Sequence, residues 1–312
     1  MHSANLRKRS ALVQILRECN NRCSHCSQSA PHLSDSDLQP LIVSEFEQRL
    51  QALLDEGLER IRLTGGEPLL HPRVTEFIAH ASGKGIDVSV VTNGLLLERL
   101  GPALASAGLR SAWISLYGPN AAEYARISER LPPTGSLARA IGTLRKAGVR
   151  TGLYCCLSSD AGCGDLSLVD ALADAGVDHV KFLQLMEQGR ALQALETAPS
   201  LRSILDGLNR FKSDHKDVRV SVSMRSGQAA WFREAGFAVP AFVGCVAGQA
   251  DSWSVDMSGL VQPCCLTLGA TVPLRIPTDA GSAASLAHCP ALPSYPRTPA
   301  GEFVCPLTYA TL

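Results

Sequence analysis

VQILRECNNRCSHCS, residues 13–27, is an apolar segment that runs directly into three cysteines. Cys19, Cys23 and Cys26 have the spacing Cys-x3-Cys-x2-Cys, and residues 13–18 have the pattern of a β-strand. Three thiols are too few for a closed four-ligand zinc site, and an odd number does not suit disulfides. The stretch therefore predicts a metal centre at the end of a strand. Zinc with His25 as fourth ligand is one alternative, and an iron–sulfur cluster with one iron left open is the other.

Segments with strand-like and helix-like patterns alternate after these cysteines. Strands are expected at residues 13–18, 60–66, 87–94, 111–118, 150–158 and 179–186, with helices at 44–58, 73–85, 98–108, 136–148 and 165–176. Ser44, with Glu47 three residues later, matches a capping box at the start of the first helix. Such alternation indicates parallel strands with right-handed crossovers. It predicts an α/β fold, a partial (β/α)6 barrel; a doubly wound sheet has the same periodicity.

The pattern changes after about residue 200, which sets the expected domain boundaries. We expect an N-terminal arm at 1–11, the partial barrel at 12–200, a bridging segment at 201–240 and a small C-terminal module at 241–312. The bridging segment contains a helix at 200–214 and a short strand at 218–223, and residues 252–265 resemble a hairpin with its turn at 257–259. The module is rich in Cys, Pro, Gly and Ser, so a bound metal is expected to stabilise it.

The composition excludes several classes of protein. The 312 residues carry 29 basic and 29 acidic side chains, so net charge attracts neither nucleic acid nor an anionic membrane. The sequence contains no apolar run of 18 residues and no signal-peptide pattern, so a cytoplasmic location is expected. Eleven cysteines in that compartment indicate metal or redox chemistry rather than disulfides.

A second motif, Gly65-Gly66-Glu67-Pro68, ends the second expected strand. With Cys19, Cys23 and Cys26 after the first strand, this motif resembles the radical S-adenosylmethionine (SAM) superfamily. The resemblance implies a 4Fe-4S cluster on the three cysteines, SAM on the open iron, and Gly65 to Pro68 at the SAM amino group. It also implies that His25 lies near the adenine, in a position where the family usually has an aromatic residue. Further SAM-contacting residues are expected at the ends of later strands: Thr92, Asn93, Ser115, Gln184 and Arg190.

The late cysteines resemble the auxiliary-cluster modules known as SPASM and twitch. Cys245, Gly259 and Cys264 match the Cys-x(9–15)-Gly-x4-Cys hairpin of those modules. The resemblance implies a second 4Fe-4S cluster held by Cys245, Cys264, Cys289 and Cys305. A zinc knuckle or unrelated free thiols are the alternatives.

The family resemblance implies a reaction. A flavodoxin or ferredoxin supplies one electron, SAM cleaves to a 5′-deoxyadenosyl radical, and the radical abstracts hydrogen from a small molecule. The layout resembles neomycin C epimerase, so epimerisation of an aminoglycoside sugar carbon is expected, with Cys265 returning hydrogen. Cys155 and Cys156 are alternative candidates for that role. Adjacent residues of a strand point to opposite faces, so one of the two is expected to face the barrel lumen. Peptide modification, alcohol oxidation and simple electron transfer are the competing functions.

Overall fold

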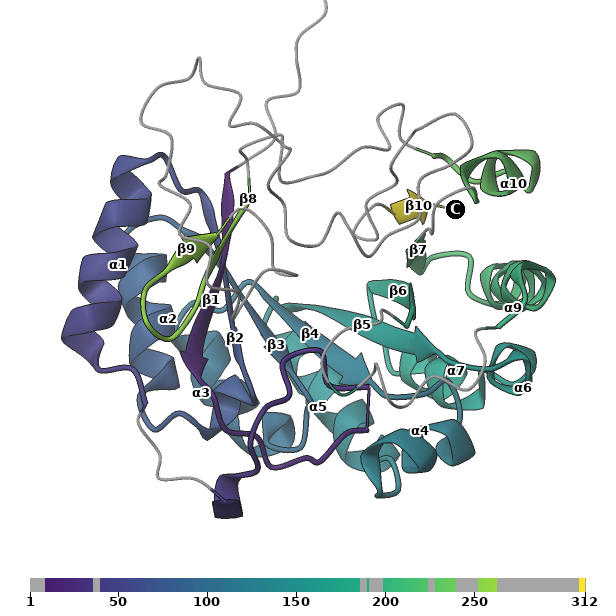
Figure 1. Cartoon of the computed structure of the whole chain (residues 1–312), viewed down its shortest axis with the longest axis horizontal. Coiled ribbons are helices and arrows are strands. Elements are labelled where there is room, and N and C mark those ends of the chain that lie inside the picture. Colours follow the sequence, from purple (N-terminus) through teal and green to yellow (C-terminus); the bar gives the residue numbers. More distant parts are fainter. Residues whose placement is uncertain are drawn as a thin grey trace, which may run out of the picture.

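Ten strands of the described chain form one curved sheet in the computed structural model (Figure 1). The structure describes residues 9–35, 40–185, 190, 199–223, 228–239, 252–262 and 309–311. The strands are β1 (Ser10–Leu16), β2 (Arg60–Gly65), β3 (Asp87–Thr92), β4 (Ser111–Leu116), β5 (Arg150–Leu157), β6 (His179–Gln184), β7 (Arg219–Ser223), β8 (Ser252–Val255), β9 (Val261–Gln262) and β10 (Tyr309–Thr311). Their order is β10-β7-β6-β5-β4-β3-β2-β1-β8-β9.

The order of the strands confirms the partial barrel. β1 to β7 are all parallel, and each pairs with the next one along the chain. A doubly wound sheet would reverse its order at a switch point, and these seven strands have none. The described sheet has two free ends, β10 and β9, so the barrel is open.

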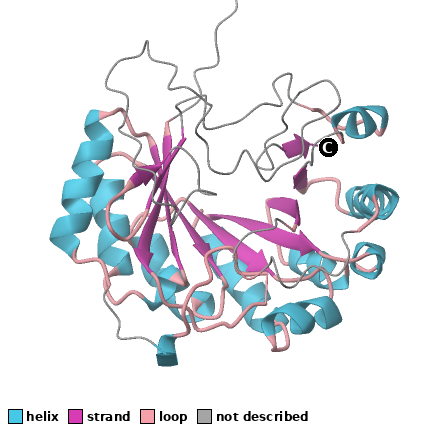
Figure 2. Cartoon of the chain, in the orientation of Figure 1, coloured by secondary structure: helices cyan, strands magenta, loops and turns pink. Residues whose placement is uncertain are grey.

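The helices lie along the outer side of the curved sheet (Figure 2). They are α1 (Val43–Asp55), α2 (Val74–Gly83), α3 (Leu97–Ser106), α4 (Ala121–Ser128), α5 (Thr134–Lys146), α6 (Asp160–Gly164), α7 (Ser167–Asp174), α9 (Leu201–Asp214) and α10 (Ala229–Glu234), with 3-10 turns η1 (Leu33–Asp35) and η2 (Pro68–Leu70). The sequence patterns did not predict α4, α6 or α10. The capping box was wrong, because α1 begins at Val43 with Ile42 as its N-cap and no side-chain cap bond.

Side chains alternate along each strand between two environments. On β4, Ala112, Ile114 and Leu116 are buried in the core under the helices. Trp113 and Ser115 lie between them in sequence, so they face the opposite side, the barrel lumen. The same alternation places the polar and ionic side chains of several strands inside the lumen, where the site is built.

Segments after residue 200 also belong to the sheet. β7 pairs in parallel with β6, so the barrel has a seventh strand where six were expected. The hairpin predicted at 252–265 is confirmed over the described residues 252–262, since β8 and β9 are antiparallel and Gly259 has φ 84° in the turn. β8 pairs in parallel with β1, and Arg49 of α1 donates to the carbonyls of Asp256 and Met257.

Two predictions about the rest of the chain have different outcomes. The predicted auxiliary cluster lies outside the described residues, and so does the predicted hydrogen donor: Cys245, Cys264, Cys265, Cys289 and Cys305. Within the described ranges, no helix is both long and apolar enough to cross a membrane.

Candidate active site

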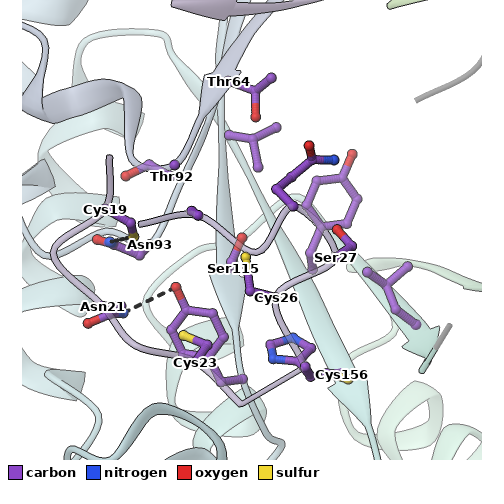
Figure 3. Close-up of a pocket in the computed structure, with 18 of the residues that line it drawn as sticks. Cys19, Asn21, Cys23, Cys26, Ser27, Thr64, Thr92, Asn93, Ser115 and Cys156 are labelled. Atoms are coloured by element: carbon purple, nitrogen blue, oxygen red, sulfur yellow. Dashed lines mark hydrogen bonds between the residues drawn. The ribbon is translucent and has the colours of Figure 1, made fainter. Parts of the chain in front are cut away.

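The three cysteines of the first motif lie on a closed loop at the carboxyl end of β1 (Figure 3). The amide of Cys19 donates to the carbonyl of Pro31 at 3.0 Å, and the amide of Leu33 donates back to the Cys19 carbonyl at 2.9 Å. Cys26 donates to the Cys23 carbonyl at 3.3 Å. The loop therefore returns on itself and brings all three thiols to one side of the barrel opening at the carboxyl ends of the strands. We call this opening the mouth.

The environment of these thiols fits the cluster that the motif implies. Burial is the main cause that raises the pKa of Cys19 to about 11 and that of Cys23 to about 12, and neighbouring thiols of the set contribute to both values. The metal-free chain therefore carries thiols at neutral pH, and metal binding would release their protons. Among the described residues, no three His, Cys, Asp or Glu side chains converge on one metal-ion position. A 4Fe-4S cluster needs a different arrangement, with each thiolate on its own iron.

Gly65 and Gly66 line the pocket where the end of β2 crosses the cysteine loop. The amide of Gly66 donates to the carbonyl of Leu16 at 2.9 Å. A Cβ at Gly66 would lie 2.2 Å from the carbonyl oxygen of Glu18, and one at Gly65 would lie 2.0 Å from that of Leu16. The glycines are therefore required for a close approach between two backbone segments, not only for the approach of a ligand.

The buried carboxylate of Glu67 has three protein partners. It accepts from the Thr92 hydroxyl at 2.7 Å, the Asn93 amide at 2.7 Å and the Leu69 amide at 3.0 Å. Burial raises the pKa of Glu67 to about 7, against the effect of these three donors. Glu67 and the buried Pro68 are not among the pocket-lining residues. Glu67 thus joins the glycine motif to the end of β3, and the contact of Glu67 and Pro68 with SAM stays a prediction.

The ends of β3 and β4 contribute the polar residues that the sequence suggested. Thr92, Asn93 and Ser115 line the pocket. The Asn93 side chain donates to Oδ1 of Asn20 at 2.7 Å and lies 3.9 Å from Sγ of Cys19 (Figure 3). The fold therefore brings these residues to the cysteine loop, and their contact with SAM stays a prediction.

His25 lies in a small cluster that includes two residues the sequence analysis missed. Its ring meets Tyr117 edge-on, with the centroids 5.5 Å apart. Burial lowers the pKa of His25 to about 4, so the imidazole is neutral at pH 7, and its buried Nδ1 has no hydrogen-bond partner. Asn21 donates to the Tyr117 hydroxyl at 3.2 Å (Figure 3). His25 remains a candidate neighbour of adenine.

Gln184 and Arg190 are both pocket-lining, as expected, but the side chain of each has protein partners. Gln184 donates to the Ser223 carbonyl at 2.7 Å, which ties β6 to β7. The guanidinium of Arg190 donates from Nε to the Cys23 carbonyl and from Nη1 to the Ala30 carbonyl, each at 3.0 Å. Arg190 therefore holds the cysteine loop, a different role from the predicted place beside adenine.

The pocket that the three cysteines line has a volume of about 390 Å³, and its lining also includes an aromatic and a cationic side chain from two strands. Tyr154 and Arg62 line the cavity, and Arg62 donates to the Tyr154 hydroxyl at 2.9 Å. Trp113 stacks on Tyr154 with ring centroids 4.8 Å apart. The Lys181 ammonium lies 4.8 Å from the Trp113 centroid, and burial lowers its pKa to about 8. We call Arg62, Trp113, Tyr154 and Lys181 the lumen floor.

Sequence reasoning did not find the lumen floor. Its members come from four different strands, and none belongs to a local motif. A signal was present, because strands of a helix-covered parallel sheet are usually apolar on both faces. Arg62 in RIRLTG and Lys181 in HVKFLQ break that rule.

The adjacent cysteines of β5 lie on opposite faces of the sheet, as the alternation of side chains along a strand predicts. Cys156 lines the pocket (Figure 3), whereas Cys155 is fully buried in the hydrophobic core. Burial raises the pKa of Cys156 to about 12, so it stays a thiol at neutral pH. The structure therefore confirms that one member of the pair faces the lumen.

Comparisons with known proteins agree with this architecture. A family model described as the Radical SAM superfamily matches residues 13–157. The chain is 31% identical over 219 residues to the GTP 3',8-cyclase of Nautilia profundicola, a match that covers 67% of each protein. It is 31% identical over 201 residues to the GTP 3',8-cyclase of Helicobacter pylori, covering 62% of this chain and 60% of that relative's length.

Solved structures show the same fold at low sequence identity. Streptococcus suis SuiB bound to its precursor peptide SuiA superposes with a TM-score of 0.67 and 13% identity, over 88% of this chain and 63% of SuiB. The enzyme anSMEcpe with bound AdoMet gives a TM-score of 0.58 and 17% identity, over 83% of this chain and 72% of that one. From the family model and the Nautilia relative, this chain belongs to the radical SAM superfamily.

Proposed function

We propose that this chain cleaves SAM reductively and directs the resulting radical at an anionic, phosphorylated small molecule held in the barrel lumen. Membership of the superfamily implies a 4Fe-4S cluster and SAM. Bound together, these groups supply a 5′-deoxyadenosyl radical that abstracts a hydrogen atom. Cys19, Cys23 and Cys26 would hold the cluster, since their thiols share one buried loop at the mouth.

Residues around the cluster loop would orient SAM and exclude water. Gly65 and Gly66 give the pocket a bare backbone wall, and Thr92, Asn93 and Ser115 offer polar groups beside it. The neutral ring of His25 gives a flat apolar surface for a base. Exclusion of water from the pocket when substrate binds would keep a reactive radical away from solvent.

The observation that carries the substrate proposal is the charge of the lumen floor. Arg62 lines the cavity, and the Lys181 ammonium lies 5.8 Å from the ring centroid of Tyr154, which also lines it. Two cations at or near the wall of a cavity attract phosphate or carboxylate groups, because a low-dielectric wall strengthens their field. GTP is the first candidate, since relatives with 31% identity are named GTP 3',8-cyclases.

The same charge argues against the aminoglycoside epimerase prediction. An aminoglycoside carries several ammonium groups, and these would face Arg62 and Arg190 in a pocket whose described lining residues include no Asp or Glu. Like charges in a confined site repel each other. Epimerisation with Cys265 as donor, and the auxiliary cluster on Cys245, Cys264, Cys289 and Cys305, stay predictions. Cys156 is the thiol that the described pocket offers for hydrogen return.

The test uses the anaerobically reconstituted protein with SAM, dithionite and GTP. We expect 5′-deoxyadenosine to form, and GTP to bind and be consumed. Arg62→Met should weaken GTP binding by at least about tenfold while SAM cleavage continues. Lys84→Met is the matched control, because Lys84 is an exposed lysine far from the lumen that bonds Gln51.

Two outcomes would overturn parts of the proposal. A fully loaded protein that makes no 5′-deoxyadenosine would remove the radical chemistry. Binding of neomycin but not of GTP, or equal GTP affinity in wild type and Arg62→Met, would remove the anionic substrate. External electron donors such as flavodoxin or ferredoxin can replace dithionite in the same assay.

A further inference from the structure

We propose that Arg190 is a positioning residue that fixes the shape of the cysteine loop and the charge around the cluster. The inference rests on the cluster site proposed above. It adds a residue that is distant in sequence from the cysteine motif, and it assigns two separable contributions to one side chain: hydrogen-bond geometry and positive charge.

The geometric contribution comes from three hydrogen bonds to the loop. Nε donates to the carbonyl of Cys23 and Nη1 donates to the carbonyl of Ala30, both at 3.0 Å. The backbone amide of Arg190 donates to the carbonyl of Cys26 at 3.1 Å. Arg190 therefore contacts the carbonyls of two expected ligands, Cys23 and Cys26, and the carbonyl of Ala30 near the end of the loop. The planar guanidinium holds its donors in a fixed fork, whereas the donors of a lysine ammonium are not set in that geometry.

The rest of the described loop shows why these bonds matter. Its ends are held by the pair of backbone bonds between Cys19, Pro31 and Leu33. Its middle is held elsewhere by the bond from the Ser24 amide to the Ile127 carbonyl at 3.0 Å. The carbonyls of Cys23, Cys26 and Ala30 point toward Arg190, which lies 167 residues from Cys23 in sequence. Loss of the guanidinium would leave two carbonyls at the mouth without these partners.

The electrostatic contribution follows from the same position. The guanidinium of Arg190 lies within hydrogen-bond distance of the Cys23 and Ala30 carbonyls, so it places a positive charge beside the cysteine loop. A cluster becomes more negative by one charge when it is reduced, so a fixed cation beside it stabilises the reduced state. Arg190 would therefore raise the midpoint potential and make the cluster easier to reduce.

Two variants separate geometry from charge, and one neighbour serves as control. Arg190→Gln removes both contributions, whereas Arg190→Lys keeps the charge and loses the fork. Arg22→Gln is the matched control, because Arg22 is on the same loop but its exposed guanidinium bonds the side chains of Ser34 and Asp35. The three variants and wild type are compared in metal-free and in reconstituted form.

Hydrogen exchange of loop residues 20–31 in the metal-free proteins measures the geometry. Exchange should be at least about tenfold faster in Arg190→Gln and in Arg190→Lys, since each loses a charge-assisted bond, and unchanged in Arg22→Gln. An EPR-monitored redox titration of the loaded proteins measures the charge. The midpoint potential should fall in Arg190→Gln and stay near wild type in Arg190→Lys.

The inference is overturned if Arg190→Gln matches wild type in both loop exchange and midpoint potential, or if Arg22→Gln changes them as much. If Arg190→Gln does not fold, the Arg190→Lys comparison decides the geometric part alone. The proposed function fails separately, when wild type itself binds no cluster. The exchange experiment still tests the loop contacts in that case, because it uses metal-free protein.

Discussion

At the mouth of the barrel, most contacts between segments are hydrogen bonds to backbone groups. At the lumen floor, the contacts between strands are made by aromatic rings and cationic side chains. Gly66 bonds the Leu16 carbonyl at the mouth, and Arg190 bonds two further loop carbonyls. At the floor, Trp113 and Tyr154 stack, with Lys181 over the Trp113 ring. The mouth has the residues proposed for the cluster and SAM, which a whole superfamily shares. The floor has the residues proposed to select the substrate.

The difference has a physical consequence for substitution. The close backbone approach at Gly65 and Gly66 leaves no room for a Cβ, so these two positions require glycine whatever ligand binds. Ring and cation contacts depend on particular side chains and can change without altering the fold. Changes at the mouth should therefore abolish SAM cleavage, and changes at the floor should alter substrate binding and local packing.

The largest expected effect is at the mouth, in Cys23→Ala. Loss of one of three thiolates should reduce 5′-deoxyadenosine formation by more than about a hundredfold, since even indirect changes at metal sites cost 10–100-fold. Iron and sulfide counting with a SAM-cleavage assay measures it. Cys155→Ala is the control, because Cys155 is packed in the core. A Cys23→Ala protein with full iron content and normal cleavage would contradict the assignment.

A second mouth variant, Gly66→Ala, tests the backbone contact itself. The added Cβ would lie 2.2 Å from the Glu18 carbonyl oxygen, so we expect a loss of about 3 kcal/mol in the free energy of unfolding. Denaturant unfolding with iron content measures both stability and loop shape. Gly83→Ala has nothing within 4 Å of the new Cβ and should be neutral or slightly stabilising. Equal behaviour of the two variants would refute the close approach.

The floor is tested by Gly152→Ala, whose Cβ would lie 2.5 Å from ring atoms of Trp113. We expect a loss of about 2 kcal/mol from overpacking. Trp113→Leu should relieve that clash, so the double variant should be more stable than the sum of the singles by about 1 kcal/mol or more. Gly142→Ala, with no atom within 4 Å, is the control. Simple additivity would show that ring and glycine do not contact.

The smallest expected effect is the pH dependence of anion binding at the floor. Burial and, to a lesser degree, Arg62 lower the pKa of Lys181 to about 8, so the side chain is charged at pH 7 and mostly neutral at pH 9. GTP affinity should fall about threefold to tenfold over that range. Lys181→Arg keeps its charge and should abolish the dependence. Equilibrium dialysis across the range measures both; identical profiles would exclude Lys181.

The mouth could be predicted from sequence because its residues are contiguous and stand at strand ends. The alternation of strand and helix patterns predicted the partial barrel, and the spacing of Cys19, Cys23 and Cys26 with the pair Gly65-Gly66 predicted where its site lies. The hydrogen bonds of Glu67 could not be predicted, because its partners Thr92 and Asn93 come from the next strand. The floor was missed since each strand gives one residue, and only the strand order brings them together.

The position of β8 beside β1 has a consequence for how the chain can be shortened. β8 covers the edge of β1 that faces away from β2, in parallel register from Ser10↔Ser252 to Val13↔Val255. An uncovered, apolar strand edge can pair with other chains and aggregate. A nascent or truncated chain that stops before Ser252 would expose this edge of β1. The strand that covers this edge is therefore synthesised more than two hundred residues after β1.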